Sequence, residues 1–198
     1  MSVGVTLNFP TTTTDQYDRT CALMGLTPRG PGPSGLLFHW ARVDGAGMTL
    51  TDVWTSRERF EEFARDQIAP LSRQAGITDP PTTTFDDVYN YLTAGTLANT
   101  ITPIAVVMEF QGKMRQYDEV MDLMGFAPKT GGADGGLFHW VTEIEGGART
   151  IDVWQDRATF EAFAESHILP YTAKVGVEPA TSLTVYNVYN YFTAGKEA

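Results

Sequence analysis

The tetrapeptide LFHW occupies residues 37–40 of this chain and returns at residues 137–140. When the sequence is shifted by 100 positions, further segments coincide along most of its length. The matching pairs are QYDRTCALMGLTP (16–28) with QYDEVMDLMGFAP (116–128), TDVWTSRERFEEFA (51–64) with IDVWQDRATFEAFA (151–164), and VYNYLTAG (88–95) with VYNYFTAG (188–195). A repeat of this length and order indicates two related domains in tandem. We therefore predict a first repeat at 1–95, a linker at 96–103 and a second repeat at 104–198.

Each repeat has the same order of expected elements. In the first repeat, apolar side chains alternate at 5–9 and predict a strand, whereas apolar residues recur at helical spacing at 15–24. The full expected order is strand 5–9, helix 15–24, strand 36–43, strand 48–54, a longer helix that begins after Ser56, and strand 84–92. This β-α-β-β-α-β order is that of the ferredoxin-like unit. The predicted fold class is therefore α+β, with two such units.

The sheet of a ferredoxin-like unit carries its helices on one face, so its other face has to be covered. The strand at 36–43 has large side chains on both faces, because Phe38 and Trp40 alternate with Leu37 and His39. Left uncovered, such a face would be a large apolar patch. We therefore expect the two units to pack sheet to sheet, as an intramolecular barrel with pseudo-twofold symmetry.

Composition and charge exclude several classes of partner. The chain has 14 Lys and Arg against 24 Asp and Glu, a formal net charge of −10, whereas nucleic-acid binding requires clustered cations. No segment approaches the roughly 20 apolar residues that cross a bilayer, and the N-terminus lacks the regions of a secretory signal. We expect a cytoplasmic protein with neither a nucleic-acid nor a membrane partner. Cys21, the only cysteine, is expected to be a small core residue.

Polar residues interrupt the apolar strands at matching positions of both repeats. The matching pairs are His39 with His139, Asp52 with Asp152, and Asn90 with Asn190. A two-residue Gly-Gly turn at 146–147 would set His139 opposite Trp154, and would place both on the same face as Asp152. The same argument places His39, Asp52 and Trp54 together in the first repeat. A carboxylate beside a histidine orients the ring for general base catalysis, so we predict His39, His139, Asp52 and Asp152 as catalytic residues.

Aromatic and amide side chains accompany these residues and would form the walls of a pocket for a flat substrate. The predicted substrate-binding residues are Trp40, Trp54, Tyr89, Asn90, Trp140, Trp154, Tyr189 and Asn190. Asparagine and tyrosine would hold a developing oxyanion by hydrogen bonds. A structural interpretation stays open for the same residues, because buried polar groups pair with each other and bulky rings fill a core.

The motifs FHW, DVW, R-x-x-F-E-x-F and VYNY resemble the dimeric α+β barrel superfamily, and more narrowly the antibiotic biosynthesis monooxygenase-like domains. The resemblance covers nearly the whole chain, once in each half. It implies an intramolecular version of a barrel that relatives usually build from two chains. It also implies chemistry on a small aromatic or polyketide-type molecule, either oxygenation without a metal, flavin or haem cofactor, or cyclisation.

Two alternatives remain at this stage. His167 has no counterpart histidine, since residue 67 is Gln, and haem-degrading relatives in the superfamily hold iron through a helix histidine. The first alternative is therefore a non-catalytic binder, either of haem, which His167 would ligate, or of a hydrophobic metabolite. No other metal site is expected, because three histidines on separate elements do not form a zinc motif. The second alternative is a duplicated scaffold with no pocket.

Overall fold

A computed structural model describes residues 1–99 and 101–196 of the chain. Residue 100, in the predicted linker, and residues 197–198, at the end of the predicted second repeat, lie outside the described residues. The described residues divide into two compact units. The first contains residues 1–87 together with the C-terminal segment from Val188, and the second contains residues 88–187.

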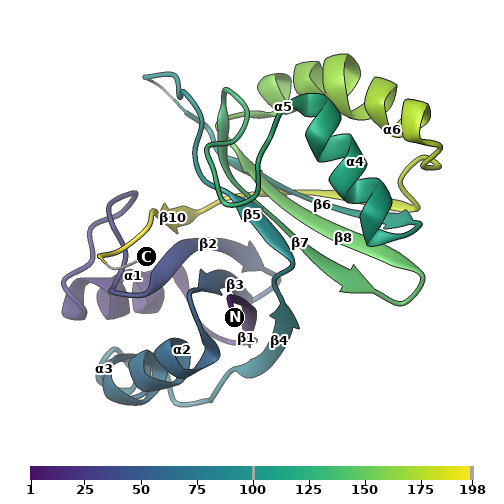
Figure 1. The fold of residues 1–198 in the computed structure, drawn as a ribbon. Coiled ribbons are helices and arrows are strands. Elements are labelled where there is room, and N and C mark those ends of the chain that lie inside the picture. Colours follow the sequence, from purple (N-terminus) through teal and green to yellow (C-terminus); the bar gives the residue numbers. More distant parts are fainter. Residues whose placement is uncertain (100, 197–198) are drawn as a thin grey trace. The chain divides into compact units, whose positions relative to one another are not determined.

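Both units have the expected ferredoxin-like order of elements (Figure 1). The first unit contains β1 (Val3–Phe9), α1 (Thr14–Leu23), β2 (Leu36–Asp44), β3 (Gly47–Trp54), α2 (Arg57–Phe63), α3 (Ala69–Gln74), β4 (Thr82–Asp87) and β10 (Asn190–Phe192). The second contains β5 (Asn90–Leu92), β6 (Ile104–Gln111), α4 (Met114–Met124), β7 (Gly136–Ile144), β8 (Gly147–Trp154), α5 (Arg157–Phe163), α6 (Leu169–Val175) and β9 (Ser182–Asn187). The predicted α+β class with two ferredoxin-like repeats is confirmed.

The strand expected at 84–92 is divided between the two units. Its first part is β4, which pairs with β1, and its second part is β5, which pairs with β7 of the second unit. In return β10, from the second repeat, pairs with β2 of the first unit (Figure 1). The sheet orders are β10-β2-β3-β1-β4 and β5-β7-β8-β6-β9. The sequence repeats and the folded units therefore do not coincide, because each repeat gives its last strand to the other unit.

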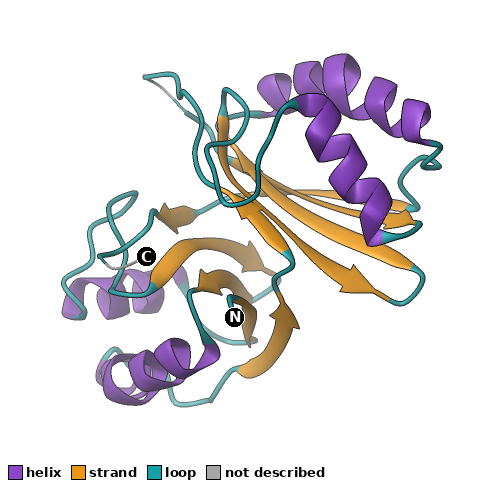
Figure 2. Cartoon of the chain, in the orientation of Figure 1, coloured by secondary structure: helices purple, strands orange, loops and turns teal. Residues whose placement is uncertain are grey.

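The helices of each unit lie on one face of its sheet, and the apolar core lies between them (Figure 2). In the first unit the indole of Trp54 packs against Phe60 and Phe63 of α2, with ring centroids 5.9 and 5.2 Å apart. The second unit repeats this cluster with Trp154, Phe160 and Phe163. Burial of these large rings is the main contribution that fixes each helix on its sheet.

A π-helical turn interrupts the longer helix of each unit, at Ala64–Ile68 and Ala164–Ile168. In the first unit the Ala69 N–H bonds to the Ala64 carbonyl, five residues back. The proline that follows, Pro70 or Pro170, has no N–H for the next helical bond, so it lies where the irregular turn already disturbs the ladder. Such turns are frequent beside functional sites.

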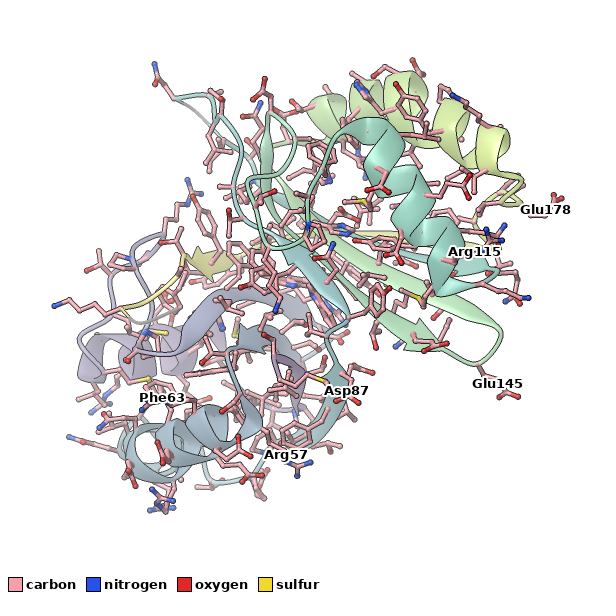
Figure 3. The ribbon with its side chains drawn as sticks, in the orientation of Figure 1. Arg57, Phe63, Asp87, Arg115, Glu145 and Glu178 are labelled. Atoms are coloured by element: carbon pink, nitrogen blue, oxygen red, sulfur yellow. The ribbon has the colours of Figure 1, made fainter. Side chains whose placement is uncertain are left out.

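The β7–β8 hairpin has a register two residues away from the predicted one. His139 lies directly opposite Asp152, and the turn between Ile144 and Gly147 consists of Glu145 and Gly146. Figure 3 shows Glu145 at the tip of this hairpin, pointing away from the strands. The expected Gly-Gly turn is wrong, because Gly147 is needed within the strand, where a Cβ would collide with the Phe110 carbonyl. A shift of two residues leaves every side chain on its predicted face.

Candidate functional site

In the first unit a histidine and a carboxylate meet between the sheet and the helices. His39 of β2 lies opposite Asp52 of β3, and the two side chains are buried. The Nδ1–H of His39 donates to Oδ1 of Asp52 at 2.6 Å. The indole N–H of Trp54 donates to the other carboxylate oxygen at 3.2 Å. This arrangement fixes the imidazole tautomer, because the ionised carboxylate holds the proton on Nδ1 and leaves Nε2 as an acceptor.

A tyrosine from the helix layer completes this chain of hydrogen bonds. The hydroxyl of Tyr17, on α1, lies 2.9 Å from Nε2 of His39 and donates to it. The side-chain amide of Asn190, on β10, donates to the same hydroxyl oxygen at 3.0 Å. The result is a continuous series, Asn190–Tyr17–His39–Asp52. The asparagine reaches it only because the last strand of the second repeat lies in the first unit.

The second unit builds the same series from the corresponding residues. His139 lies 2.7 Å from Asp152 through Nδ1, and the Tyr117 hydroxyl lies 3.0 Å from its Nε2. The amide of Asn90, on β5, donates to the Tyr117 hydroxyl at 3.0 Å. Each series therefore combines three residues of one repeat with an asparagine of the other.

The amide of each asparagine is held by a strained turn of the backbone. Its carbonyl oxygen accepts an N–H from Arg29 in the first unit and from Lys129 in the second, both at 3.3 Å. These two residues have positive φ values of 63° and 61°, which are uncommon for residues other than glycine. Because both amide ends are engaged, the asparagine presents its N–H₂ to the tyrosine in one orientation.

Burial keeps the two tyrosines protonated. It raises the pKa of Tyr17 and of Tyr117 well above the ordinary phenol value, and the hydrogen bond from the asparagine offsets this only in part. In the first unit burial also raises the pKa of Cys21 to about 11, and its thiol contacts Tyr17. Cys21 is buried, as expected for a core residue. The tyrosine therefore acts as a neutral donor toward the histidine and as an acceptor on its other side.

A cavity lies beside each series. In the second unit it has a volume of about 110 Å³, and in the first about 70 Å³. Tyr117, His139 and Asp152 line the larger cavity, and most of its other lining residues are aromatic or apolar. These residues include Phe110, Phe126, Phe138, Trp154 and Phe163. Such an enclosure, apolar with a few convergent polar groups, is typical of small-molecule sites.

The structure brings together some of the predicted site residues and separates others. His39, Asp52 and Trp54 line the smaller cavity, and their counterparts in the second repeat line the larger one. Trp40 and Trp140 line neither; they neighbour the histidines along the strands and so lie on the opposite face of each sheet. Tyr89 and Tyr189 are 48% and 40% exposed. Their hydroxyls donate to Asp118 and Asp18 on the helix surface.

The sequence pattern does not predict the two tyrosines of the hydrogen-bonded series. Tyr17 lies in the segment 15–24, whose helical spacing predicts a buried ring, and the ring is buried. The available signal was the tripeptide QYD, which stands at 16–18 and again at 116–118. Helix periodicity explains a buried ring at that position but says nothing of the partner that its hydroxyl finds.

His167 is not among the residues that line the larger cavity, although it packs against one of them. Its ring stacks on Phe163, with centroids 4.8 Å apart, and its Nδ1 lies 2.8 Å from the hydroxyl of Ser166. A haem held in the larger cavity would therefore not find this histidine among the lining residues. Within 1–99 and 101–196, no group of three or more His, Cys, Asp or Glu side chains is placed to hold a metal ion.

Two solved structures resemble the chain over nearly its whole length. One is a candidate monooxygenase from Fusobacterium nucleatum, with 10% identity, a TM-score of 0.64, and coverage of 98% of this chain and 95% of that one. The other is a candidate monooxygenase from Lactobacillus acidophilus, with 12% identity, a TM-score of 0.62, and coverage of 98% and 97%. The chain shares the fold of these two structures, with both repeats in one polypeptide.

No protein-family model matches the sequence. No curated protein matches it either. In the part of the chain that the structure describes, no helix has the length and apolar character required to span a bilayer.

Proposed function

We propose that the protein is a cofactor-independent, monooxygenase-like enzyme of secondary metabolism that acts on a small aromatic or polyketide-type substrate. The observation that carries this proposal is the Tyr–His–Asp series at the polar end of a cavity with aromatic walls. The monooxygenase-like fold of the two similar structures supports it.

The series provides a route for a proton that leaves the substrate. Tyr117 lines the cavity, and its hydroxyl proton points at Nε2 of the histidine. When the oxygen accepts a proton from an acidic C–H or O–H of the substrate, the phenolic proton passes to the histidine. The imidazolium formed is stabilised by the carboxylate at 2.7 Å. The tyrosine is neutral before and after the transfer, in agreement with its raised pKa.

Loss of that proton prepares an aromatic ketone for reaction with oxygen. The resulting enolate is electron-rich and transfers its electrons to O₂ while one C–O bond forms. In the overall reaction a CH₂ group and O₂ give a C=O group and H₂O, so that one oxygen atom enters the product and the other leaves as water. Apolar walls exclude bulk water, and this strengthens the electrostatic stabilisation of the enolate. Cyclisation would need the same proton acceptor without O₂.

The test is oxygen uptake with anthrone, whose product in this reaction is anthraquinone. We expect the double variant His39→Ala, His139→Ala to lose activity by about a hundredfold or more, the usual contribution of a positioned base. Asp52→Asn with Asp152→Asn should act in the same direction, because the amide no longer stabilises the imidazolium.

His167→Ala is the matched control, since this histidine lies outside the cavity lining, and it should keep wild-type activity. Oxygen uptake that persists in the His39→Ala, His139→Ala variant, together with a lowered melting temperature, would show that the histidines are structural. Enolate formation without oxygen uptake would instead identify a cyclase, and substrate binding without enolate formation would identify a binder.

A further inference from the structure

Two large side chains in the core of the first unit are replaced by small ones that line the cavity of the second. Leu36 and Met48 are buried in the core of the first unit. The corresponding residues are Gly136 and Ala148, and both line the larger cavity. The second unit has a cavity of about 110 Å³ where the first has about 70 Å³, although Cys21 and Leu26 of the first are replaced by the larger Met121 and Phe126.

The polar groups of the second unit are also incompletely paired. In the first unit Trp54 donates to Asp52 Oδ2, and position 50 is an apolar leucine. In the second unit Asp152 Oδ2, the indole N–H of Trp154 and the hydroxyl of Thr150 have no hydrogen-bond partner among the described residues. All three residues are more than nine-tenths buried, and all three are among the residues that line the larger cavity. A buried polar atom without a partner is costly, so three such atoms beside one cavity favour a ligand that would pair with them.

The charge of the cavity lining and the exposure of the histidine and aspartate side chains also favour the second unit as the binding site. Lys113 lines the larger cavity, whereas the smaller one has no Lys or Arg among its described lining residues. The side chains of His139 and Asp152 are 15% and 10% exposed, against 8% and 6% for His39 and Asp52. The second series can therefore be reached from its cavity more easily than the first.

We infer that the second unit alone binds the small-molecule ligand, and that the first unit is a closed structural copy. The ligand is a flat aromatic molecule with a hydrogen-bond donor directed at Asp152 Oδ2 and an acceptor for the indole of Trp154. The inference rests on the proposed function for the site but concerns binding, which can be measured without turnover. Thr150 and Ala148 then determine specificity, the first by its hydroxyl and the second by the space that it leaves.

The test is calorimetric titration of the whole chain with 2-naphthol, a two-ring probe that carries one donor. We expect one probe to bind per chain, at least tenfold more tightly than 2-fluoronaphthalene, which has nearly the same shape and no donor. Two probes per chain, equal affinity for the two probes, or no binding of 2-naphthol would each overturn the inference.

Two variants of the second unit and one matched variant of the first locate the site. Ala148→Met restores the residue of the first unit and should weaken 2-naphthol binding at least tenfold, because it fills the cavity. Thr150→Val removes only the hydroxyl and should weaken binding about threefold or more, the value of one hydrogen bond. Leu50→Thr, the matching change in the first unit, should leave affinity unchanged.

Thermal melting monitored by circular dichroism shows whether each variant is folded. If Ala148→Met does not fold, Thr150→Val still tests the inference. Weaker binding in Leu50→Thr and not in Thr150→Val would place the ligand in the first unit and overturn the inference. Tight 2-naphthol binding without oxygen uptake from any anthrone-type substrate would contradict the proposed function alone. Full oxygen uptake by a folded Ala148→Met variant would contradict the inference and leave the proposed function intact.

Discussion

Tyr17 and Tyr117 show how one residue connects packing with chemistry in this fold. Each ring fills the space between helix and sheet, while its hydroxyl joins the asparagine of an exchanged strand to the histidine of the sheet. Because the hydroxyl both accepts and donates, removal of this one atom leaves two buried partners without a hydrogen bond. Loss of such a pair costs more than the bond itself contributes.

The raised pKa of these phenols makes stability depend on pH in the alkaline range. Their folded pKa lies above the unfolded value near 10, so their contribution is complete below pH 10 and is lost as the pH rises further. Each tyrosine should lower the free energy of unfolding by about 1.4 kcal/mol per pH unit above that point. Urea denaturation between pH 8 and 11 measures this slope. Tyr17→Phe with Tyr117→Phe should flatten it, and a slope unchanged by these substitutions would contradict the assignment.

At the scale of elements, the exchange of the short strands β5 and β10 determines which residues meet. Strand β10 adds to the edge of β2, and its Asn190 reaches Tyr17, which is 173 positions away in the sequence. An edge strand of three residues contributes little pairing energy by itself. The main effects of β10 are therefore to cover the edge of β2 and to place Asn190 beside Tyr17.

Deletion of residues 188–198 should therefore destabilise the first unit, although the deleted segment belongs to the second repeat. We expect faster amide hydrogen exchange in β2 and α1, because the β2 edge and the Tyr17 hydroxyl lose their partners. Exchange in β7 and α4, which depend on β5, should be unchanged. Mass spectrometry of peptic fragments makes the comparison, and faster exchange confined to the second unit would disprove the assignment of β10.

At the scale of the whole molecule, one chain contains what resembles a dimer with reciprocal strand exchange. Each unit is completed by a strand of the other repeat. Neither repeat alone can therefore form a finished unit, even though each contains a full set of expected elements.

Separately expressed chains 1–95 and 104–198 should associate with each other in equal amounts when mixed. Each would supply the strand and the asparagine that the other lacks. Size-exclusion chromatography with light scattering should detect a one-to-one complex with a circular dichroism spectrum close to that of the intact chain. Two stable monomers that do not interact would show that strand exchange is dispensable.

The sequence by itself determined the duplication, the order of elements and the common face of histidine and aspartate. These features follow from local periodicity, and even an error of two residues in the hairpin register left the face unchanged. The predicted site residues Trp40, Trp140, Tyr89 and Tyr189 line neither of the two cavities described, since residue type alone does not give the neighbour that a side chain meets.

Only the tertiary structure decided that 84–92 divides into two strands of different sheets, and that Asn90 and Asn190 serve opposite repeats. A short strand can pair with any free sheet edge, including edges formed by segments far away in the sequence. A local sequence pattern does not predict which of these edges it joins. The structure likewise decided that the two units differ as sites. In the sequence, the replacement of Leu36 by Gly136 and of Leu50 by Thr150 looks like ordinary variation between repeats. These replacements affect cavity volume and leave a polar atom unpaired only because the sheet and helices of the second unit enclose them.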